Sequence, residues 1–456
     1  MEASTRTRPE RGQQLELVVD ALAYGGSGVA RHEGYVVFVA GAVPGDRVSA
    51  VVTKRKRAYA EARTVELLEP SPDRVEPLAP GHPGAPWQVL PYERQLAVKA
   101  EQVDDALRRI GRLEGYELEP IVPAGERWRY RNKVEYSFGG GSGGELVCGF
   151  HRPGSWEEIV HVDDDLLASE RVNAARRAVL AWCREAGLEA YDRREQRGLL
   201  RNLVVREGRR TGEVQVRVVT SEGALDADAL AAALGGVADA LFWTRIDGVA
   251  EVTAGGRTEL ATGATQLREE LGGLEYGISP EAFFQTNTEM AERLYGVAAE
   301  YAALSGWERV FDLYCGMGTI GLTLAPRAGE VFGLEVVEEA ISDAIANARR
   351  NQVDNARFFA GDVRLALREL VERAGRPDVI VVDPPRSGLS QKVVRRVVEA
   401  APKRIVYVSC NPTTLAPNAA QLAEAGYALR RVRPVDMFPQ THHIECVALL
   451  ERGTSP

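Results

Sequence analysis

One cysteine stands where an open α/β sheet would present it to a ligand. Cys410 follows the mostly apolar run Arg404–Val408 and lies in the segment Ser409-Cys-Asn-Pro412, whose residues are typical of a turn. Open α/β sheets bind ligands at the carboxyl ends of their strands. A thiol is a strong nucleophile although only a few per cent of it is ionised at pH 7. The position therefore predicts covalent catalysis, and a buried structural cysteine is the alternative.

A glycine-rich loop follows an earlier strand of the same region. The segment Asp312-Leu-Tyr-Cys-Gly-Met-Gly-Thr-Ile-Gly321 opens a helix, and Glu335 ends the next strand. Glycines let the backbone approach a ligand, and an acid at the end of the second strand can accept hydrogen bonds from ribose hydroxyls. The loop also satisfies Gly-x-Gly-x-x-Gly, so a dinucleotide is an alternative. Because Asp312 would repel a pyrophosphate and attract an amino group, a nucleoside that carries an amino acid fits better.

Further charged residues follow the later strands. Asp362 comes after the third strand and could bond an adenine amine, with an ordinary turn carboxylate as the alternative. Asp383 ends the fourth strand, and the two prolines after it hold this carboxylate out of helical geometry. Arg386 could meet a phosphate or pair with an acid. Glu445 begins the last predicted strand, where a carboxylate by itself is no sign of function.

These side chains need a sheet of parallel strands to position them. From about Trp307, strand-like and helical runs alternate, which predicts a doubly wound α/β sheet. The last two strand-like runs have no helix between them and predict an antiparallel hairpin at the sheet edge: Tyr427–Val432 and Glu445–Leu450. The other strands are expected at Arg309–Leu313, Glu330–Leu334, Ala356–Ala360, Asp378–Val382 and Arg404–Val408, and the helices at Ile320–Leu324, Val337–Asn351, Arg364–Arg373, Gln391–Ala400 and Thr414–Ala425.

The amino-terminal part of the chain predicts a different fold. Strand-like runs separated by glycine turns fill Gln14–Glu69 and predict a small OB-like barrel. Lys54, Arg55, Lys56 and Arg57 are consecutive cations at an expected strand junction. Such a local run favours RNA contact over a β-rich appendage without a partner.

The middle of the chain is expected to be α+β. Ser71–Pro91 is rich in proline and predicts a linker, and Tyr92–Leu113 has the spacing of an amphipathic helix. Cations alternate with aromatic residues through Arg127–Lys133, and a strand there would place the cations on one face. Strand-like and helical runs then follow one another as far as the catalytic region.

Composition limits the class of protein. The 456 residues suggest about two or three domains. The net charge of −9 argues only weakly against nucleic acid, because charged patches can be segregated. The five cysteines form no Cys-x-x-Cys pair, which disfavours a disulfide framework and a zinc knuckle. The chain contains no apolar run of membrane-spanning length and no secretory signal, so a cytoplasmic protein is expected.

Several segments match a known family in order along the chain. The chain resembles the S-adenosylmethionine-dependent RNA uracil-5-methyltransferases, which make 5-methyluridine in ribosomal and transfer RNA. The resemblance implies a TRAM-like OB barrel at 12–70, a central α+β RNA-binding domain at 71–275 whose helix at 92–113 could pack on the catalytic domain, and a class I methyltransferase domain at 276–453. The matching segments are Phe283-Phe-Gln-Thr-Asn287, Asp312-Leu-Tyr-Cys-Gly-Met-Gly318, Gly333-Leu-Glu335, Val382-Asp-Pro-Pro-Arg386, Ser409-Cys-Asn-Pro412 and Asp436-Met-Phe-Pro439 through Glu445.

The resemblance also implies a covalent mechanism. Cys410 attacks carbon 6 of the uracil, carbon 5 takes the methyl group, and Glu445 removes the proton from carbon 5 so that elimination frees the cysteine. Covalent addition divides one difficult step into two easier ones. A base that reacts in this way must be unpaired or extruded, and Phe283 would stack near it. The other RNA contacts expected are Arg131, Arg386 and Lys54–Arg57, and the residues expected at the cofactor are Gln285, Tyr314, Gly316, Gly318, Thr319, Glu335, Asp362 and Asp383.

One stretch departs from the family. Many relatives hold an iron–sulfur cluster through Cys-x5-Cys-Gly-Gly-Cys and a later cysteine. Here the matching stretch Pro80–Gln88 contains no cysteine, and the later position falls near Val162–Asp165. Without thiolates no cage can form, so we expect neither a cluster nor another metal. Proline stiffness and the Trp87 side chain could hold the loop instead.

The expected substrate is a uridine in 23S ribosomal RNA, because the barrel resembles the TRAM domain common in the ribosomal branch. Transfer RNA and another methyl acceptor, such as cytosine, are alternatives. A non-catalytic RNA-binding protein on a methyltransferase scaffold is a further alternative, against which the intact Cys410 and Glu445 argue. A monomer without membrane association is expected.

Overall fold

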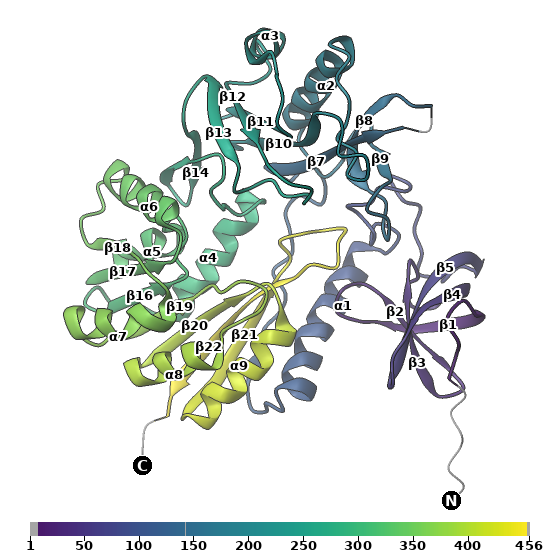
Figure 1. Cartoon of the computed structure of the whole chain (residues 1–456). Coiled ribbons are helices and arrows are strands. Elements are labelled where there is room, and N and C mark those ends of the chain that lie inside the picture. Colours follow the sequence, from purple (N-terminus) through teal and green to yellow (C-terminus); the bar gives the residue numbers. More distant parts are fainter. Residues whose placement is uncertain (1–7, 142, 454–456) are drawn as a thin grey trace, which may run out of the picture.

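The computed structural model describes residues 8–141 and 143–453. Residues 1–7, on which part of the expected absence of a secretory signal depends, lie outside the described residues. A closed barrel, a central sheet and a carboxyl-terminal sheet follow one another along the chain (Figure 1). Among the helices described, none is long and apolar enough to cross a membrane.

The amino-terminal strands close into a barrel with the order β1-β2-β3-β5-β4. Along β1, side chains alternate between solvent and core, so that Leu15, Leu17 and Val19 point inward. The sequence did not predict β2, whose glycine neighbours resemble a turn. The basic run Lys54–Arg57 spans the end of β4 and the turn to β5, as expected. The strands are β1 (Gln14–Leu22), β2 (Gly28–His32), β3 (Tyr35–Ala40), β4 (Arg47–Arg55) and β5 (Tyr59–Glu69).

The central sheet has the order β13-β12-β11-β10-β7-β8-β9. Helices α2 (Glu170–Glu185) and α3 (Ala227–Ala233) pack with its strands in one apolar core, to which Val179 and Leu230 belong. The strands are β7 (Lys133–Gly140), β8 (Leu146–His151), β9 (Ile159–His161), β10 (Leu200–Glu207), β11 (Val214–Thr220), β12 (Ala240–Arg245) and β13 (Arg257–Thr262).

The alternation of cations before β7 does not form a strand. The strand begins only at Lys133, and Arg129 has a φ of 59°, which is incompatible with an extended run. Arg127 instead lies 4.2 Å from the Tyr92 ring, and Arg129 pairs with Asp164. The expectation of a single basic face was therefore wrong, because Arg127 and Arg129 contact partners on two different segments.

The carboxyl-terminal sheet has the order β18-β17-β16-β19-β20-β22-β21-β6. Strands β16 to β20 are parallel, and β22 enters antiparallel between β20 and β21. The expected hairpin is thus present, with β6 (Glu117–Leu118) paired outside it. The other strands are β16 (Arg309–Leu313), β17 (Glu330–Glu335), β18 (Ala356–Ala360), β19 (Val379–Val382), β20 (Arg404–Ser409), β21 (Tyr427–Val435) and β22 (Glu445–Arg452).

Helices cover both faces of this sheet, as the strand–helix alternation predicted (Figure 1). A separate hairpin, β14 (Leu267–Leu271) with β15 (Leu274–Ile278), precedes the first of them. The helices are α4 (Thr288–Ala302), α5 (Thr319–Leu324), α6 (Glu338–Arg350), α7 (Val363–Ala374), α8 (Gln391–Ala400) and α9 (Pro412–Glu424). The domain boundaries at 70/71 and 275/276 stay predictions.

Helix α1 (Tyr92–Asp105), which continues as a π-helical turn at Ala106–Ile110, packs in the core of the carboxyl-terminal sheet. Lys99 on this helix donates to Asp436 Oδ1 at 2.6 Å, and both side chains are fully buried. The Tyr92 hydroxyl donates to Asp436 Oδ2 at 2.8 Å. Excellent geometry and additional hydrogen bonds are what a buried ion pair needs to offset desolvation. This pair therefore fixes the start of the loop that leads to Glu445.

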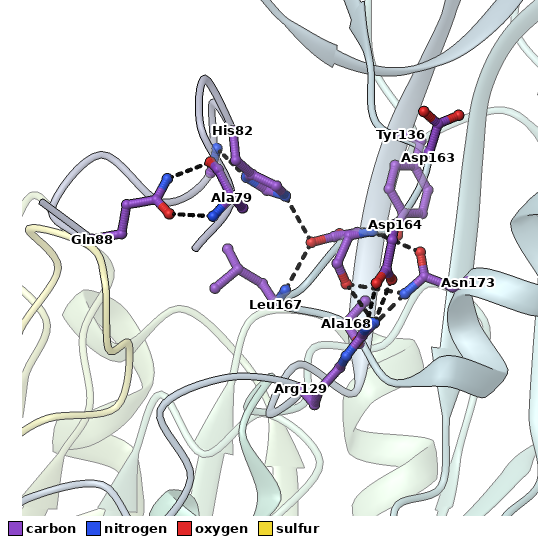
Figure 2. Close-up of polar contacts among 12 residues, drawn as sticks. Ala79, His82, Gln88, Arg129, Tyr136, Asp163, Asp164, Leu167, Ala168 and Asn173 are labelled. Carbon is purple, nitrogen blue, oxygen red and sulfur yellow. Dashed lines mark hydrogen bonds and ion pairs between the residues drawn. The ribbon is translucent and has the colours of Figure 1, made fainter. Parts of the chain in front are cut away.

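The cysteine-free loop at 79–90 is held by side chains (Figure 2). His82 points toward the Asp163–Ala168 segment, where its Nε2 lies 2.9 Å from Asp165 Oδ1. His82 Nδ1 accepts from the Gly84 N–H at 3.0 Å, so Nε2 is the nitrogen that donates. The Tyr136 hydroxyl also donates to Asp165. The two segments that were expected at the cluster positions therefore meet through a histidine and an aspartate.

Trp87 anchors the other end of this loop. Its side chain is buried with Leu22 and Val43 of the barrel and Val98 of α1. Among the residues that the structure describes, no group of three or more His, Cys, Asp or Glu side chains could hold a metal ion. The absence of iron in the purified protein stays a prediction.

We expect His82→Ala to lower the free energy of unfolding by about 1–3 kcal/mol, because it leaves the buried Asp165 carboxylate without one of its donors. Urea denaturation followed by tryptophan fluorescence measures this loss. His161→Ala is the control, since its partner Asp163 is 98% exposed, and an ion pair with an exposed partner contributes at most about 1 kcal/mol. His161 also donates to the Cys148 carbonyl, which keeps a second donor in Arg176 when His161 is removed. Equal losses in the two variants would contradict the assignment.

Candidate functional site

The carboxyl ends of β16 and β19 meet at the point where the strand order reverses. Strand β16 pairs with β17 on one side and β19 on the other, with Leu313 opposite Val382. Such a switch point is where open α/β sheets bind ligands. Tyr314 follows β16 with a φ of 64°, which a non-glycine residue adopts only under strain. Stored strain at this turn is typical of a functional site.

The glycine loop allows a close backbone approach. Gly318 has a φ of 84° and would carry a Cβ only 2.8 Å from the Phe358 ring. Gly316 has a φ of 51° and donates its N–H to Glu335 Oε2 at 3.3 Å. Thr319 begins α5, where its hydroxyl donates to the Tyr295 hydroxyl at 3.2 Å. Loop, helix start and acid are thus arranged as the sequence predicted.

Two carboxylates at the switch point have strongly raised pKa values. Asp312 is fully buried, and burial raises its pKa to about 7. Its Oδ2 accepts from the Gly321 N–H at 2.8 Å, whereas Oδ1 has no partner among the described residues. Burial also raises the pKa of Asp383 to about 7. An unpartnered buried carboxylate oxygen fits a cationic group, and the ammonium of S-adenosylmethionine is such a group.

Two further cofactor residues predicted from the sequence differ in their surroundings. Gln285 is buried shortly before α4, and its backbone carbonyl oxygen accepts a hydrogen bond from Asn132 Nδ2 at 2.9 Å. Asp362 is the N-cap of α7 and accepts from the Arg364 N–H at 2.8 Å. Its carboxylate is also paired with the Arg364 guanidinium, which lowers its pKa. The adenine contact of Asp362 stays a prediction, in competition with this capping role.

The antiparallel pairing of β22 with β20 brings Glu445 to Cys410. Ser409, the last residue of β20, lies opposite Cys446, so Cys410 follows β20 at the level of Glu445, the first residue of β22. Cys410 is half-buried on the turn into α9, and Glu445 is 5% exposed. Burial raises the pKa of Cys410 to about 11, and the charges of Glu445 and Asp383 add to this rise. Burial likewise raises the pKa of Glu445 well above its usual range.

The expected RNA contacts do not all lie together. Phe283 is 68% exposed, as a stacking platform needs to be. Arg386 lowers the pKa values of both Cys410 and Glu445 through its charge. Arg131 is half-buried, and its Nε has no partner in the described part of the chain. The Lys54–Arg57 run lies apart on the barrel, at the turn between β4 and β5.

Other residues of this site were not predicted from the sequence. Burial, and then the charges of His442, Arg386 and Arg131, lower the pKa of His443 to about 3. The His442 ring lies 4.3 Å from the His443 ring. Tyr24 reaches the Cys410 turn from the barrel. The adjacent histidines could have been noticed beside Glu445, whereas nothing in the local sequence distinguishes Tyr24.

A separate cavity of about 500 Å³ lies in the central sheet. It contains Trp156, Tyr191 and Arg201 but shares no lining residue with the switch point or the Cys410 turn. Its guanidiniums are already engaged, since Arg193 pairs with Glu251 and Arg194 with Glu157. This cavity is therefore not the candidate catalytic site.

The fold and the switch-point residues together define a methyltransferase, and comparisons with known proteins identify its class. A family model for tRNA (uracil-5-)-methyltransferases matches residues 266–453, and a TRAM domain model matches residues 8–65. An uncharacterised RNA methyltransferase of Halalkalibacterium halodurans is 38% identical, over 96% of both chains. An uncharacterised RNA methyltransferase of Bacteroides thetaiotaomicron is also 38% identical, over 94% of this chain and 100% of that protein.

A solved structure is similar over nearly the whole chain. It is the tRNA (uracil-54, C5)-methyltransferase of Pyrococcus abyssi in complex with S-adenosyl-L-homocysteine. It shares 30% identity, covers 95% of this chain and 99% of its own, and has a TM-score of 0.78. The present chain therefore belongs to the S-adenosylmethionine-dependent RNA uracil-5-methyltransferase family.

We expect the affinity for S-adenosylhomocysteine to fall as pH decreases below about 7, the pKa to which burial raises Asp312. A raised pKa means that the carboxylate is charged only above this pH, and the ligand's ammonium group needs that charge. The decrease should reach up to about tenfold per pH unit. Titration calorimetry on both sides of this pH measures it.

Asp312→Asn should bind the ligand more weakly and with a flatter pH dependence. The matched control is Asp354→Asn, at an exposed carboxylate in the turn between α6 and β18. An Asp312→Asn variant with the pH profile of the wild type would contradict the predicted contact.

Proposed function

We propose that this enzyme methylates carbon 5 of a uridine in RNA through a covalent bond between Cys410 and carbon 6 of the uracil. The observation that carries the proposal is the placement of Cys410 opposite Glu445, with the carboxylate of Asp383 close enough to affect the Cys410 thiol. A nucleophile and a proton acceptor side by side, with acidic residues that can attract a cationic cofactor, are the parts that this reaction requires.

Cys410 is the proposed nucleophile. Its raised pKa of about 11 means that the thiol is protonated in the ligand-free protein, so its proton passes to water as the sulfur attacks, and Glu445 stays free for the later step. The sulfur adds to carbon 6, and the electron pair displaced from the carbon 5–carbon 6 double bond makes carbon 5 nucleophilic. S-adenosylmethionine supplies an electrophilic methyl group on a sulfonium centre. Positive charge near Asp383 and Glu445 would also favour their ionised forms and that of the thiol.

Glu445 is the proposed general base. After methylation, carbon 5 carries both a proton and the new methyl group. Glu445 takes this proton, the carbon 5–carbon 6 double bond re-forms, and the carbon–sulfur bond breaks to release Cys410. Its buried position excludes water, and its raised pKa makes it a stronger proton acceptor than an ordinary carboxylate once it is ionised. Phe283 is the proposed stacking partner of the extruded base, with Arg131 and Arg386 beside it.

Two RNA classes remain as substrates to be distinguished. The TRAM barrel motivates 23S ribosomal RNA, and the similar Pyrococcus abyssi enzyme, whose substrate is tRNA, motivates tRNA. Transcripts of the two classes, assayed side by side for transfer of labelled methyl groups and mapped for 5-methyluridine, decide between them. Labelling of neither RNA, in the presence of bound cofactor, would contradict the proposed function.

We expect Glu445→Gln to accumulate a covalent enzyme–RNA complex, because addition and methylation do not need this base whereas release does. Denaturing electrophoresis of labelled RNA measures the complex. Cys410→Ala is the matched control and should form none, although it should still bind S-adenosylhomocysteine. Free methylated RNA released at the normal rate by Glu445→Gln would exclude the proposed role of Glu445.

We expect replacement of Lys56 and Arg57 by glutamine to weaken RNA binding and its salt dependence. Each lost phosphate contact should reduce the slope of log K against log salt by about 0.7–0.9. The control replaces Arg368 and Arg373, which are exposed on α7. An unchanged slope would show that the basic run is an ordinary solvated face. Replacing these charges tests RNA binding more specifically than removing the barrel does. Removal would also delete Tyr24, which contacts the Cys410 turn.

A further inference from the structure

The β1–β2 turn of the barrel reaches the turn that carries Cys410. The Tyr24 hydroxyl donates a hydrogen bond to the Cys410 carbonyl at 3.1 Å, across 386 positions of the chain. Tyr24 is half-buried, and burial, followed by the charge of Cys410, raises its pKa to about 12. The phenol therefore keeps its proton and can donate at neutral pH.

The turn that carries Tyr24 is closely fitted into this position. Ala23 N–H donates to the Ser27 carbonyl at 2.8 Å, which closes the turn. Gly26 has a φ of 89°, and a Cβ on it would lie 3.0 Å from His442 Nδ1. The turn therefore contacts both Cys410 and, at its tip, the segment that leads to Glu445.

The base of the same turn is attached to helix α1. Gln102 Nε2 donates to the Leu22 carbonyl at 3.1 Å, and the Leu22 side chain packs with Trp87 and Val98. Helix α1 is itself fixed to the catalytic sheet through Lys99 and Asp436. The barrel is thus attached at its base independently of Tyr24, so the Tyr24 hydroxyl is not needed to keep the barrel in place.

We propose that Tyr24 is a positioning residue for the Cys410 nucleophile, so that the barrel contributes to the covalent step and not only to RNA binding. The inference rests on the proposed function of Cys410. A hydrogen bond to the carbonyl of residue 410 restrains the peptide plane between the end of β20 and the start of α9. The direction of the Cys410 side chain depends on that plane, and a small misplacement of a reacting group slows its reaction strongly.

The test compares Tyr24→Phe with the full-length wild type. Loss of one hydrogen bond should slow formation of the covalent complex with 5-fluorouridine-containing RNA by about 3- to 10-fold at saturating RNA and cofactor. The dissociation constants for RNA and S-adenosylhomocysteine should stay within about twofold, since the substitution touches neither contact. A role in barrel docking alone would change the RNA affinity or the melting temperature and leave the saturated rate unaltered.

The matched control is Tyr35→Phe, whose hydroxyl donates to the Tyr59 carbonyl at 3.0 Å inside the barrel. The same hydroxyl also donates to the carbonyl of Lys56 in the basic run, so this variant can weaken RNA binding. It should nevertheless keep the normal rate of complex formation at saturating RNA, because it loses no contact to the Cys410 turn. A Tyr24→Phe rate within about twofold of the wild type would overturn the proposal. So would an equal loss of rate in both variants, because the effect would then come from the barrel as a whole.

A second measurement separates this proposal from the proposed function. The rate at which iodoacetamide alkylates Cys410 is followed against pH, with Cys410→Ala as the background. Tyr24→Phe should alter this profile, whereas Tyr35→Phe should not. If the wild type forms no covalent complex with the RNA, the proposed function fails, and the alkylation profile still decides whether Tyr24 positions the thiol. An alkylation profile identical to that of the wild type overturns the role of Tyr24.

Discussion

The register between β20 and β22 is the constraint on which the site depends. Ser409 faces Cys446 across an antiparallel ladder that continues to Arg404 and Glu451. A slip of one residue would turn every side chain of β22 to the opposite face. Both strands are buried along almost their whole length. Such a slip would turn Val447 and Leu449, or their neighbours, toward the core on the opposite face of the sheet. The apolar core thereby fixes the relative position of the two proposed reacting groups, Cys410 and Glu445.

Burial of carboxylates, offset only in part at Glu445 by the charge of Arg386, gives this site its electrostatic character. Asp312, Asp383 and Glu445 all have raised pKa values because the surrounding protein disfavours their charged forms. In a structural core such groups would be a cost without benefit. A cationic cofactor would be attracted to these carboxylates, because it supplies the positive charge that the protein does not supply there. The buried carboxylates therefore lower the stability of the free enzyme and raise its affinity for the cofactor.

Local patterns in the sequence predicted most of the carboxyl-terminal sheet. Each of its parallel strands is a short apolar run followed by a helix with charged residues. The periodicity of the apolar residues is therefore enough to distinguish the strands from the helices. Strand β2 was missed because Gly28 and its neighbours carry turn signals, and Arg127–Lys133 was misread because pairing with Asp164 and stacking on Tyr92 overrode the alternation. The pairing of His82 with Asp165 and the approach of Tyr24 to Cys410 join distant segments, so no local pattern could predict them.

The contact between Tyr24 and Cys410 also has a consequence for the order in which the enzyme matures. The barrel precedes β22 along the chain, and domains generally fold from the amino end as they emerge from the ribosome. The barrel can thus fold and expose its basic turn before Cys410 has been translated. The Cys410 turn, which Tyr24 contacts, gains its proposed partner Glu445 only when β22 has entered the sheet. A chain translated only as far as α9 would therefore lack the assembled pair.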